Sequence, residues 1–327
     1  MGLFLGVDGG GSTTVAILAD KSGQVVGYGL GGTGNFQIDG IEPARAEVQK
    51  SISSALDNAG VDLSSVVSAY FGMAGADRLR DFKIVRNLLE PLIPPTIHWN
   101  FENDAILGLW AGTFDGVGVG VVCGTGTNVV GVNLQGKRVQ IGGMGSLFGD
   151  YAGGSYIGER AIALSMRGVE GRGEPTSMYD AILEHYGIEH LLDLVDRIYD
   201  KENLKLGDLV SLVMNAASQG DQVAIDLLQE VGRELGISTN AAIRQLFHAQ
   251  EQVKVVGVGS VFQKPKIAIM YDEFAKTLHD AEYGDIDIQI PTTEPAVGSI
   301  YGAAAQIGYS ISDDFKARLE ESARQYM

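Results

Sequence analysis

Two segments of the chain repeat one pattern of apolar and polar positions. Residues 6–29 and 122–143 each contain an apolar run, a turn rich in Gly, Ser and Thr, a second apolar run, a polar turn and a third run. Short apolar runs separated by such turns predict β-strands joined as hairpins. A glycine-rich turn lets several backbone N–H groups approach an anion, because glycine has no Cβ. Two matched turns therefore predict a site that holds one polyphosphate from both sides.

The remainder of the first half alternates helical spacing with strand-length apolar runs. We expect helices over residues 41–58, 78–89 and 105–111, the first of them ending at Gly60, and strands over residues 66–73 and 96–101. Strands that alternate with helices are typical of an α/β layer architecture.

The second half repeats this start and then becomes mostly helical. We expect helices over residues 155–166, 177–185, 188–199, 206–217 and 221–250, the last interrupted near Gly236, then a buried strand over 253–258 and closing helices over 295–307 and 313–325. The pattern predicts an α/β fold of two related halves, with a helical insertion in the second.

Length and charge narrow the range of partners. The 327 residues are enough for two domains, each with its own core. Lys and Arg number 24 against 41 Asp and Glu, for a net charge of −17 without a basic cluster, which argues against nucleic acid and anionic membrane surfaces as partners. The N-terminus has no basic signal region, and polar residues interrupt the uncharged stretch 116–136. We therefore expect a cytoplasmic protein that spans no membrane.

Cysteine and histidine offer little metal chemistry. Cys123 is the single cysteine, so an intrachain disulfide is excluded and a cysteine-ligated zinc or iron–sulfur centre within one chain is disfavoured. None of the five histidines is paired at metal-ligand spacing, and we interpret them as structural or surface residues.

The two glycine-rich turns are the candidate phosphate site. Asp8 ends the first strand and is expected to bind Mg²⁺ directly or through water, while Gly10, Gly11, Ser12 and Thr13 meet phosphate oxygens. The alternative for this turn alone is a hairpin with a turn aspartate. The matched turn favours phosphate binding, and its residues are Gly124, Thr125, Gly126 and Thr127.

A third glycine segment follows a strand late in the chain. Small residues at Gly257, Gly259 and Ser260 allow a flat adenine or a ribose to lie against the backbone, although close helix–strand packing explains such glycines equally well. No GxxxxGK[ST] loop is present, and no GxGxxG opens a helix after a first strand, so Walker and Rossmann sites are disfavoured.

Asp104 is the candidate general base. It follows a strand and starts a helix in the half opposite the second turn. The alternative role is helix N-cap, and the two roles are compatible. Asn35, Asp77 and Asp150 lie in glycine-containing loops and are interpreted either as turn residues or as polar substrate contacts.

These motifs together resemble a known group of proteins. The DGGGST opening, the GTGTN turn and the late GVGS segment resemble the sugar kinase/heat-shock-70/actin superfamily of ATPases. Within it, the segments at residues 74–78 (AGADR), 103–105 (NDA), 142–150 (GGMG followed by GD) and 296–304 (AVGSIYGAA) are similar to the BadF/BadG ATPase family, which includes N-acetylglucosamine kinases.

The resemblance implies two ribonuclease-H-like (actin-like ATPase) domains with the active site in the cleft between them. The first would span residues 1–115 with a C-terminal helix at 310–327, and the second residues 116–309 with the helical insertion. The implied reaction is ATP- and Mg²⁺-dependent transfer of the γ-phosphate to the 6-hydroxyl of an amino sugar, most simply N-acetylglucosamine, by a homodimer whose cleft closes to exclude water.

Residue roles carry over by motif. Asp8 would position Mg²⁺, Ser12 and Thr125 would hold phosphates, and Gly259 with Ala217 would line the adenosine site. The residues implied as sugar contacts are Asn35, Asp77, Asp104, Thr127, Gly143, Met144 and Asp150.

Departures from the family pattern lie at the implied sugar pocket. Met144 stands where sugar kinases of this group have tryptophan, and Tyr151 replaces a glutamate. A broad hexose, glucosamine or N-acetylmuramic acid kinase therefore stays open, as does a non-catalytic sugar sensor. An activator ATPase of a 2-hydroxyacyl-CoA dehydratase is strongly disfavoured, because its shared iron–sulfur cluster needs two cysteines from each subunit.

Overall fold

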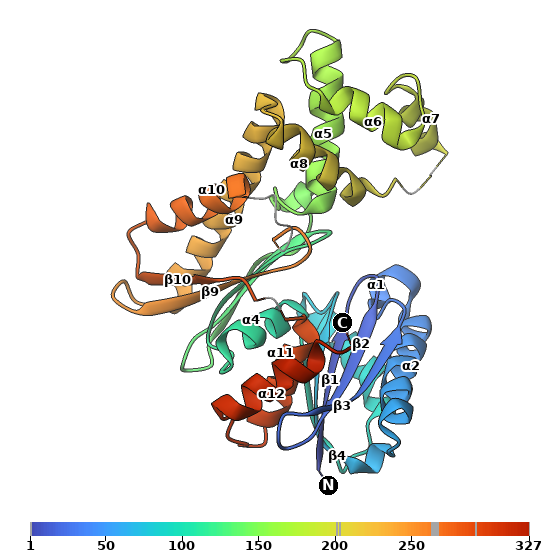
Figure 1. Ribbon diagram of the computed structural model, residues 1–327, viewed down its shortest axis with the longest axis vertical. Coiled ribbons are helices and arrows are strands. Elements are labelled where there is room, and N and C mark those ends of the chain that lie inside the picture. The colour runs from blue at the N-terminus through green and yellow to red at the C-terminus, as the bar shows by residue number, and fades with distance from the viewer. Residues whose placement is uncertain (1, 201, 203, 263–267, 292, 327) are drawn as a thin grey trace.

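The computed structural model of the chain describes residues 2–200, 202, 204–262, 268–291 and 293–326. Its strands form two five-stranded mixed sheets, one in each half of the molecule (Figure 1). The first sheet has the order β3-β2-β1-β4-β5 and contains β1 (Leu3–Gly9), β2 (Thr14–Ala19), β3 (Val25–Gly31), β4 (Val66–Met73) and β5 (His98–Glu102). The second has the order β10-β9-β6-β7-β8 and contains β6 (Gly118–Cys123), β7 (Thr127–Val132), β8 (Arg138–Gly142), β9 (Gln252–Val258) and β10 (Asp285–Gln289).

The two sheets have the same topology. Read from β8 to β10, the second sheet repeats the strand order of the first. In each sheet the first three strands form an antiparallel meander, and the last two run parallel to the first. The repeat expected from the two glycine-turn segments is therefore present as two equivalent three-stranded units.

The helices of the first half follow the predicted spacing closely, except for the short first helix, which was not predicted. They are α1 (Phe36–Asp39), α2 (Ile41–Ala59), α3 (Leu79–Leu89) and α4 (Ala105–Thr113). The helix α2 ends at Gly60, which adopts the left-handed conformation expected of a helix C-terminal glycine. Short 3₁₀ turns occur in both halves, at η1 (Leu63–Ser65), η2 (Glu90–Leu92), η3 (Ser146–Phe148) and η4 (Leu206–Leu209).

The chain returns to the first half earlier than expected. The helix α11 (Pro295–Ala305) packs against β1, β4 and α4, although residues up to 309 were expected to group with the second half. Its Ile300 and Tyr301 share one buried cluster with Phe4 and Tyr70 of the first sheet. The C-terminal helix α12 (Asp313–Ala323) joins the same cluster, so both α11 and α12 lie with the N-terminal strands (Figure 1).

The helix α4 lies where the two halves meet. Leu107 on one side packs with the α11 cluster. Ile106 and Leu109 on other sides pack with Val130 and Val256 of the second sheet. The helix α4 is therefore buried nearly all round and contacts both halves.

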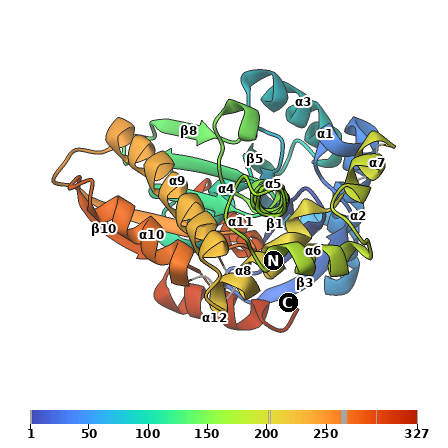
Figure 2. The same cartoon turned by 90° about the horizontal axis from the view of Figure 1, so that it is seen from above.

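The second half carries most of the additional helices. They are α5 (Gly154–Val169), α6 (Met178–Tyr186), α7 (Asp193–Tyr199), α8 (Val210–Ser218), α9 (Gln222–Leu246) and α10 (Ala268–His279). In the chain, α5 to α9 separate β8 from β9, and in space α5 to α8 lie at the end of the molecule remote from the first half (Figure 1). The helices α9 and α10 pack side by side along the second sheet (Figure 2).

One expected break is absent. The helix α9 is continuous through Gly236, where an interruption was expected. A Cβ at Gly236 would lie 2.6 Å from Cβ of Thr277 on α10, and one at Gly232 would meet the Met270 carbonyl. These glycines therefore permit close helix packing and do not end the helix.

In the second half, two elements differ from expectation at their starts, and one helix and one strand were not expected. The helix α7 begins at Asp193 and not near residue 188, and the segment at 206–217 begins as a 3₁₀ turn. The helix α10 and the edge strand β10 were not anticipated. Within the described ranges, no helix is both long and apolar enough to cross a membrane.

Candidate active site

Both glycine-rich turns line a single cavity of about 510 Å³ between the halves. Gly11 and Ser12 come from the first turn, and Gly124 to Thr127 come from the second. The loops after β3, β4, β5 and β8 and the start of β7 complete the wall with Asn35, Asp77, Asn103, Asp104, Asn128 and Gly143, among others. The facing arrangement predicted for the two turns is therefore what the fold produces.

The first turn joins β1 to β2. The backbone N–H of Gly10 donates to the Thr13 carbonyl at 3.0 Å, which closes the turn. Thr14 is buried, and its hydroxyl donates to the Gly32 carbonyl at 2.8 Å. Gly11, Ser12 and Thr13 remain exposed, so their polar groups are available to a ligand.

The second turn joins β6 to β7 and is held from behind. The Gly154 N–H donates to the Gly124 carbonyl at 2.7 Å, and the Ser155 N–H donates to the Thr125 carbonyl at 2.9 Å. Both donors belong to the first residues of α5. Since the turn's carbonyls face α5, the exposed hydroxyl of Thr125 is left free to meet a ligand.

Two carboxyl groups at this site carry shifted pKa values. Burial raises the pKa of Asp8 to about 8, and the negative charges of Asp104 and Glu294 add to the increase. Burial also raises the pKa of Asp104 to about 6, with a further contribution from Asp77, while backbone hydrogen bonds oppose the change. Asp104 lines the cavity and Asp8 does not, but a buried carboxyl group beside other acids is a position where a cation would be stabilised.

Asp104 occupies the helix N-terminus as expected. Its Oδ1 accepts a hydrogen bond from the Ala105 N–H at 3.0 Å, and its side chain lines the cavity. The capping role and exposure to the cavity therefore coexist, as the sequence allowed. A cap bond also fixes the orientation of the carboxyl group.

A hydrogen-bonded chain of polar side chains crosses between the halves. Asp77 accepts from the Asn103 Nδ2 at 2.9 Å and from the Gln140 Nε2 at 3.4 Å. The Asn103 Oδ1 in turn accepts from the Asn128 Nδ2 at 3.2 Å. Asn128 is only 9% exposed, and its Oδ1 has no hydrogen-bond partner among the described residues. A buried acceptor without a donor costs free energy, and a ligand hydroxyl or amide that reached it would relieve this cost.

Sequence reasoning missed Asn103, Asn128, Gln140 and Glu294 as individual site residues. Asn103 directly precedes Asp104, and Asn128 ends the GTGTN turn, so position relative to a predicted strand end was an available signal for both. Gln140 and Glu294 have no local signal, because only the tertiary fold brings them to the cleft.

Asn35 and Asp150 both organise loops. The Asn35 Oδ1 caps α1 by accepting from the Gln37 N–H at 2.9 Å, and Asn35 also lines the cavity. The Asp150 Oδ2 accepts from the backbone N–H groups of Met144 at 2.6 Å and Gly145 at 2.5 Å. The carboxylate of Asp150 therefore sets the shape of the loop that carries Gly143.

The expected adenosine residues lie behind the second turn. A Cβ at Gly259 would lie 2.6 Å from the Cys123 carbonyl oxygen, so this glycine permits close packing against the turn. Ala217 is 5% exposed in the core of the second half. Among the described residues that line the cleft cavity, Gly257, Gly259, Ser260 and Ala217 are absent, and neither is Met144 one of them.

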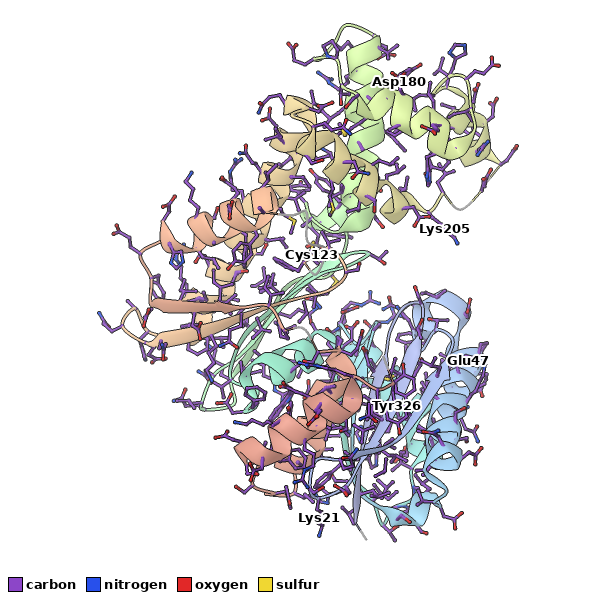
Figure 3. The ribbon with its side chains drawn as sticks, in the orientation of Figure 1. Lys21, Glu47, Cys123, Asp180, Lys205 and Tyr326 are labelled. Atoms are coloured by element: carbon purple, nitrogen blue, oxygen red, sulfur yellow. The ribbon has the colours of Figure 1, made fainter. Side chains whose placement is uncertain are left out.

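Cys123 is buried at the end of β6, directly before the second turn. Burial raises its thiol pKa to about 12, so it stays protonated and unreactive. It lies where the second half faces the first (Figure 3).

The acidic groups fit a cation that arrives with its own ligands. Across the described residues, no group of three or more His, Cys, Asp or Glu side chains forms a metal cage. Mg²⁺ is commonly held by one or two carboxylates together with substrate phosphates. The raised pKa of Asp8 fits this mode, since burial raises it most and Asp104 and Glu294 add to the increase, and a nearby cation would favour the ionised form against all three.

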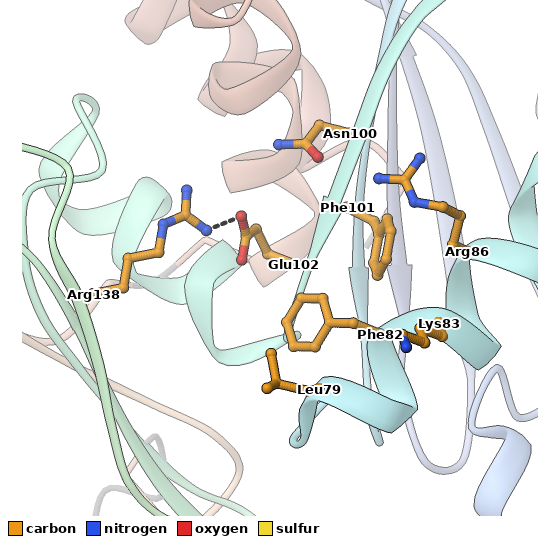
Figure 4. Close-up of a pocket in the computed structure, with 8 residues that line it drawn as sticks. All are labelled: Leu79, Phe82, Lys83, Arg86, Asn100, Phe101, Glu102 and Arg138. Atoms are coloured by element: carbon orange, nitrogen blue, oxygen red, sulfur yellow. Dashed lines mark hydrogen bonds and ion pairs between the residues drawn. The ribbon is translucent and has the colours of Figure 1, made fainter.

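The two halves also contact each other at the edges of their sheets. Arg138 on β8 forms an ion pair with Glu102 on β5 (Figure 4). The pair borders a separate pocket of about 400 Å³. Arg86 lies over the rings of Trp99 and Phe101 there, at 5.3 and 5.4 Å from the ring centroids.

A family model describes nearly the whole chain. Residues 5–303 match the BadF/BadG/BcrA/BcrD ATPase family. The chain belongs to this family.

Named relatives of this BadF/BadG/BcrA/BcrD family member are sugar kinases. It is 27% identical to an N-acetyl-D-glucosamine kinase of Dictyostelium discoideum, over 91% of this chain and 96% of the relative. It is 29% identical to an N-acetylmuramic acid/N-acetylglucosamine kinase of Clostridium acetobutylicum, over 94% of this chain and 99% of the relative.

Solved structures share the fold. A provisionally named N-acetylglucosamine kinase from Chromobacterium violaceum superposes with a TM-score of 0.71 at 21% identity, covering 92% of this chain and 98% of that one. A ROK family glucokinase from Streptomyces griseus, solved with glucose and AMPPNP, gives 0.58 at 16% identity, covering 93% and 99%. The mixed α/β architecture with two five-stranded sheets is thus shared with these two structures.

Proposed function

We propose that the chain is an ATP-dependent kinase that transfers the γ-phosphate to the 6-hydroxyl of an amino sugar, with N-acetylglucosamine as the leading acceptor. The observation that carries this is the single cavity lined by both glycine turns and by Asp104. Turns with exposed amides and hydroxyls suit a polyphosphate, and a carboxyl group beside them suits proton removal from an alcohol. The kinases among its relatives support the same reaction.

The phosphate groups have a defined place in this proposal. Ser12 and Thr13 of the first turn, with Gly10 and Gly11, meet phosphate oxygens from one side. Thr125 meets them from the other side, with Gly124 and Gly126. Bound Mg²⁺ would supply charge neutralisation at the phosphates, with Asp8 positioning it directly or through water. Gly257, Gly259, Ser260 and Ala217 remain our proposed adenosine wall, reached from behind the second turn.

Asp104 acts as the general base in the transfer step. Its carboxylate accepts the proton of the 6-hydroxyl as that oxygen forms a bond to the γ-phosphorus. The bond between the γ-phosphorus and the β–γ bridging oxygen breaks, and ADP leaves. A pKa of about 6 keeps Asp104 mostly ionised at neutral pH while leaving it basic enough to take the proton.

The acceptor contacts are Asn35, Asp77, Thr127, Gly143, Met144 and Asp150. To these the geometry adds Asn128, whose free Oδ1 can accept from a sugar hydroxyl or amide. Asp150 contributes mainly by shaping the 143–145 backbone.

We also propose the domain arrangement. Two ribonuclease-H-like domains, the second with the α5–α8 insertion, close on the cleft by rotating about the α4–α11 contact. The first domain then includes α11 as well as α12. Homodimerisation and a cytoplasmic location stay predictions of the family resemblance, and sedimentation velocity tests the first.

An ADP-release assay tests the function directly. Purified protein with Mg-ATP is offered N-acetylglucosamine, glucosamine, glucose and mannose, and the product is examined by ³¹P and ¹H NMR. We expect a 6-phosphate monoester from an amino sugar. Release of ADP that no sugar accelerates, or phosphorylation at another hydroxyl, would contradict the proposal.

A further inference from the structure

A smaller chamber adjoins the cleft on the side of the second half. Its volume is about 260 Å³, and it shares Thr125, Gly126, Thr127 and Gly143 with the cleft cavity. Beyond these shared residues, its wall includes Asp150 and the first two turns of α5, with Ser155, Tyr156 and Glu159. An acceptor held by Thr127 and Gly143 therefore has room for substituents to extend toward α5.

The described walls of both spaces hold carboxyl groups and no basic side chain. Asp150 and Glu159 border the chamber, and Asp77 and Asp104 border the cleft. The adjacent cation on α5, Arg160, is paired with Glu230 on α9 at 3.2 Å. The Tyr156 hydroxyl also donates to Glu230. Arg160 is therefore paired with a carboxylate and is not among the residues that line the chamber.

The adjoining cleft wall presents a further bare acceptor. Asn128 is more than nine-tenths buried there, and its Oδ1 has no hydrogen-bond partner in the described part of the chain. Carboxylates and a carbonyl oxygen all require donors. Hydroxyl, amide N–H and ammonium groups supply donors, whereas a carboxylate cannot.

ATP and a negatively charged acceptor differ in how their charge would be compensated at these walls. The polyphosphate lies against backbone amides and brings Mg²⁺, so its charge is compensated locally. A carboxylate on the acceptor would bring no cation of its own and would meet no basic side chain in the described walls. Glu159 is exposed, so its repulsion of an anion is partly screened by solvent and salt, but an interface can still reject a ligand by such repulsion.

We propose that this chamber, bordered by Asp150 and Glu159, receives the acceptor substituents remote from the 6-hydroxyl and rejects anionic ones. The acceptors are then neutral or ammonium-bearing amino sugars, and N-acetylmuramic acid is rejected because of its lactyl carboxylate. This inference rests on the proposed function. It also separates the chain from its Clostridium acetobutylicum relative, which is named for both sugars.

The test compares kcat/KM for N-acetylglucosamine and N-acetylmuramic acid. We expect the wild-type protein to favour the neutral sugar by about 10-fold or more, and to do so less at high salt, since the repulsion is screened. Glu159→Gln removes one charge with little change of shape and should raise the relative use of N-acetylmuramic acid roughly 3- to 10-fold. Glu174→Gln is the matched control, because Glu174 is exposed beyond the far end of α5 and should leave the ratio unchanged.

The outcomes are distinguishable from failure of the proposed function. Equal use of both sugars, or a Glu159→Gln ratio equal to that of the control, overturns the inference while leaving a kinase. If no sugar is phosphorylated, the proposed function fails, and calorimetric titration of each sugar decides the inference alone. Binding of N-acetylglucosamine but not N-acetylmuramic acid then supports it, whereas equal binding of both, or binding of neither, overturns it.

Discussion

The two glycine-turn hairpins share one fold but carry a polar side chain on opposite strands. In the first, Asp8 on the incoming strand pairs with Val15 on the outgoing strand, one step before the turn. In the second, Val122 on the incoming strand pairs with Asn128 at the equivalent step. The polar side chain has thus changed strands between two otherwise matched units. Under the proposed function, the first hairpin would present an acid to a cation and the second an amide to the acceptor, so one repeated unit would serve two different parts of the reaction.

The largest expected effect comes from Asp104, which lines the same cavity as both hairpin turns. Asp104→Asn should lower kcat roughly 10²–10⁴-fold, because the amide cannot take the proton. Since Asn caps a helix as well as Asp, thermal stability should change little. Steady-state ADP release and thermal unfolding provide the two measurements. Asp221→Asn, a second N-cap aspartate at α9, is the control and should turn over normally. Normal turnover by Asp104→Asn would remove the general-base assignment.

The pH dependence sharpens the same assignment. Asp104 must be ionised to accept a proton, and its pKa is about 6. We therefore expect kcat/KM to fall about 10-fold per pH unit below roughly pH 6 and to level off above it. The residual activity of Asp104→Asn should lack this acid limb. A wild-type profile that stays flat down to pH 4.5 would show that another group, or none, is the base.

Asp8→Asn tests the acid of the first hairpin. We expect the Mg²⁺ concentration for half-maximal rate to rise, with a loss of about 10- to 100-fold at limiting Mg²⁺. Ser22→Ala, in the remote turn of the same meander, is a suitable control. An unchanged Mg²⁺ requirement in Asp8→Asn would place the cation elsewhere.

Thermal stability tests the raised pKa of Asp8 independently of activity. Its pKa in the folded protein is about 8, against an ordinary value of 3.8, so the folded state binds the proton more tightly. The stabilisation of the fold by protonated Asp8 is fully present below its ordinary pKa of 3.8 and is lost as pH rises through about 8. Without ligands, the melting temperature of the wild type should therefore fall relative to that of Asp8→Asn between pH 5 and pH 9. Parallel curves would show that the carboxyl group is not strained by burial.

Asn128→Val gives the second hairpin the residue type of the first. We expect KM for the sugar to rise about 10-fold, because the free Oδ1 and the bond to Asn103 are lost together. KM for ATP should stay nearly constant. A similar rise in both constants would indicate that Asn128 organises the whole cleft and does not contact the acceptor in particular.

The smallest effect is expected at the outer join of the sheets. Arg138 is 51% exposed at its side chain, so its pair with Glu102 should contribute at most about 1 kcal/mol. A double-mutant cycle with Arg138→Gln and Glu102→Gln, followed by chemical unfolding, measures the coupling. A value well above this would make the pair a structural clamp between the halves.

Much of the architecture follows from local pattern, and the misses have identifiable causes. The strand over residues 66–73 and the helix ending at Gly60 have strong local signals, and both are present at those bounds. The break expected at Gly236 is wrong because a partner helix, invisible in local sequence, requires small residues there. The edge strand β10 has a clear alternation of Asp and Ile that was available but unused.

The residues of the candidate site also divide into those with a local sequence signal and those without one. The two turns and Asp104 were predictable because each lies at a strand end, and parallel topology gathers such ends at one cleft. Asn128 and Glu159 were not singled out, since their importance depends on which face of a strand or helix meets the cavity. Packing of α11 on the first sheet was also missed, because contacts between residues nearly 300 positions apart leave no local periodicity.

The position of α11 has a consequence for biosynthesis. One face of the first sheet is covered by α11 and α12, which follow β10 in the chain and so leave the ribosome after both sheets. The strands of the first sheet therefore stay uncovered while the second sheet and its helices are being completed. We expect the later-made half to reach its native packing first, and the earlier-made half to wait for α11 and α12.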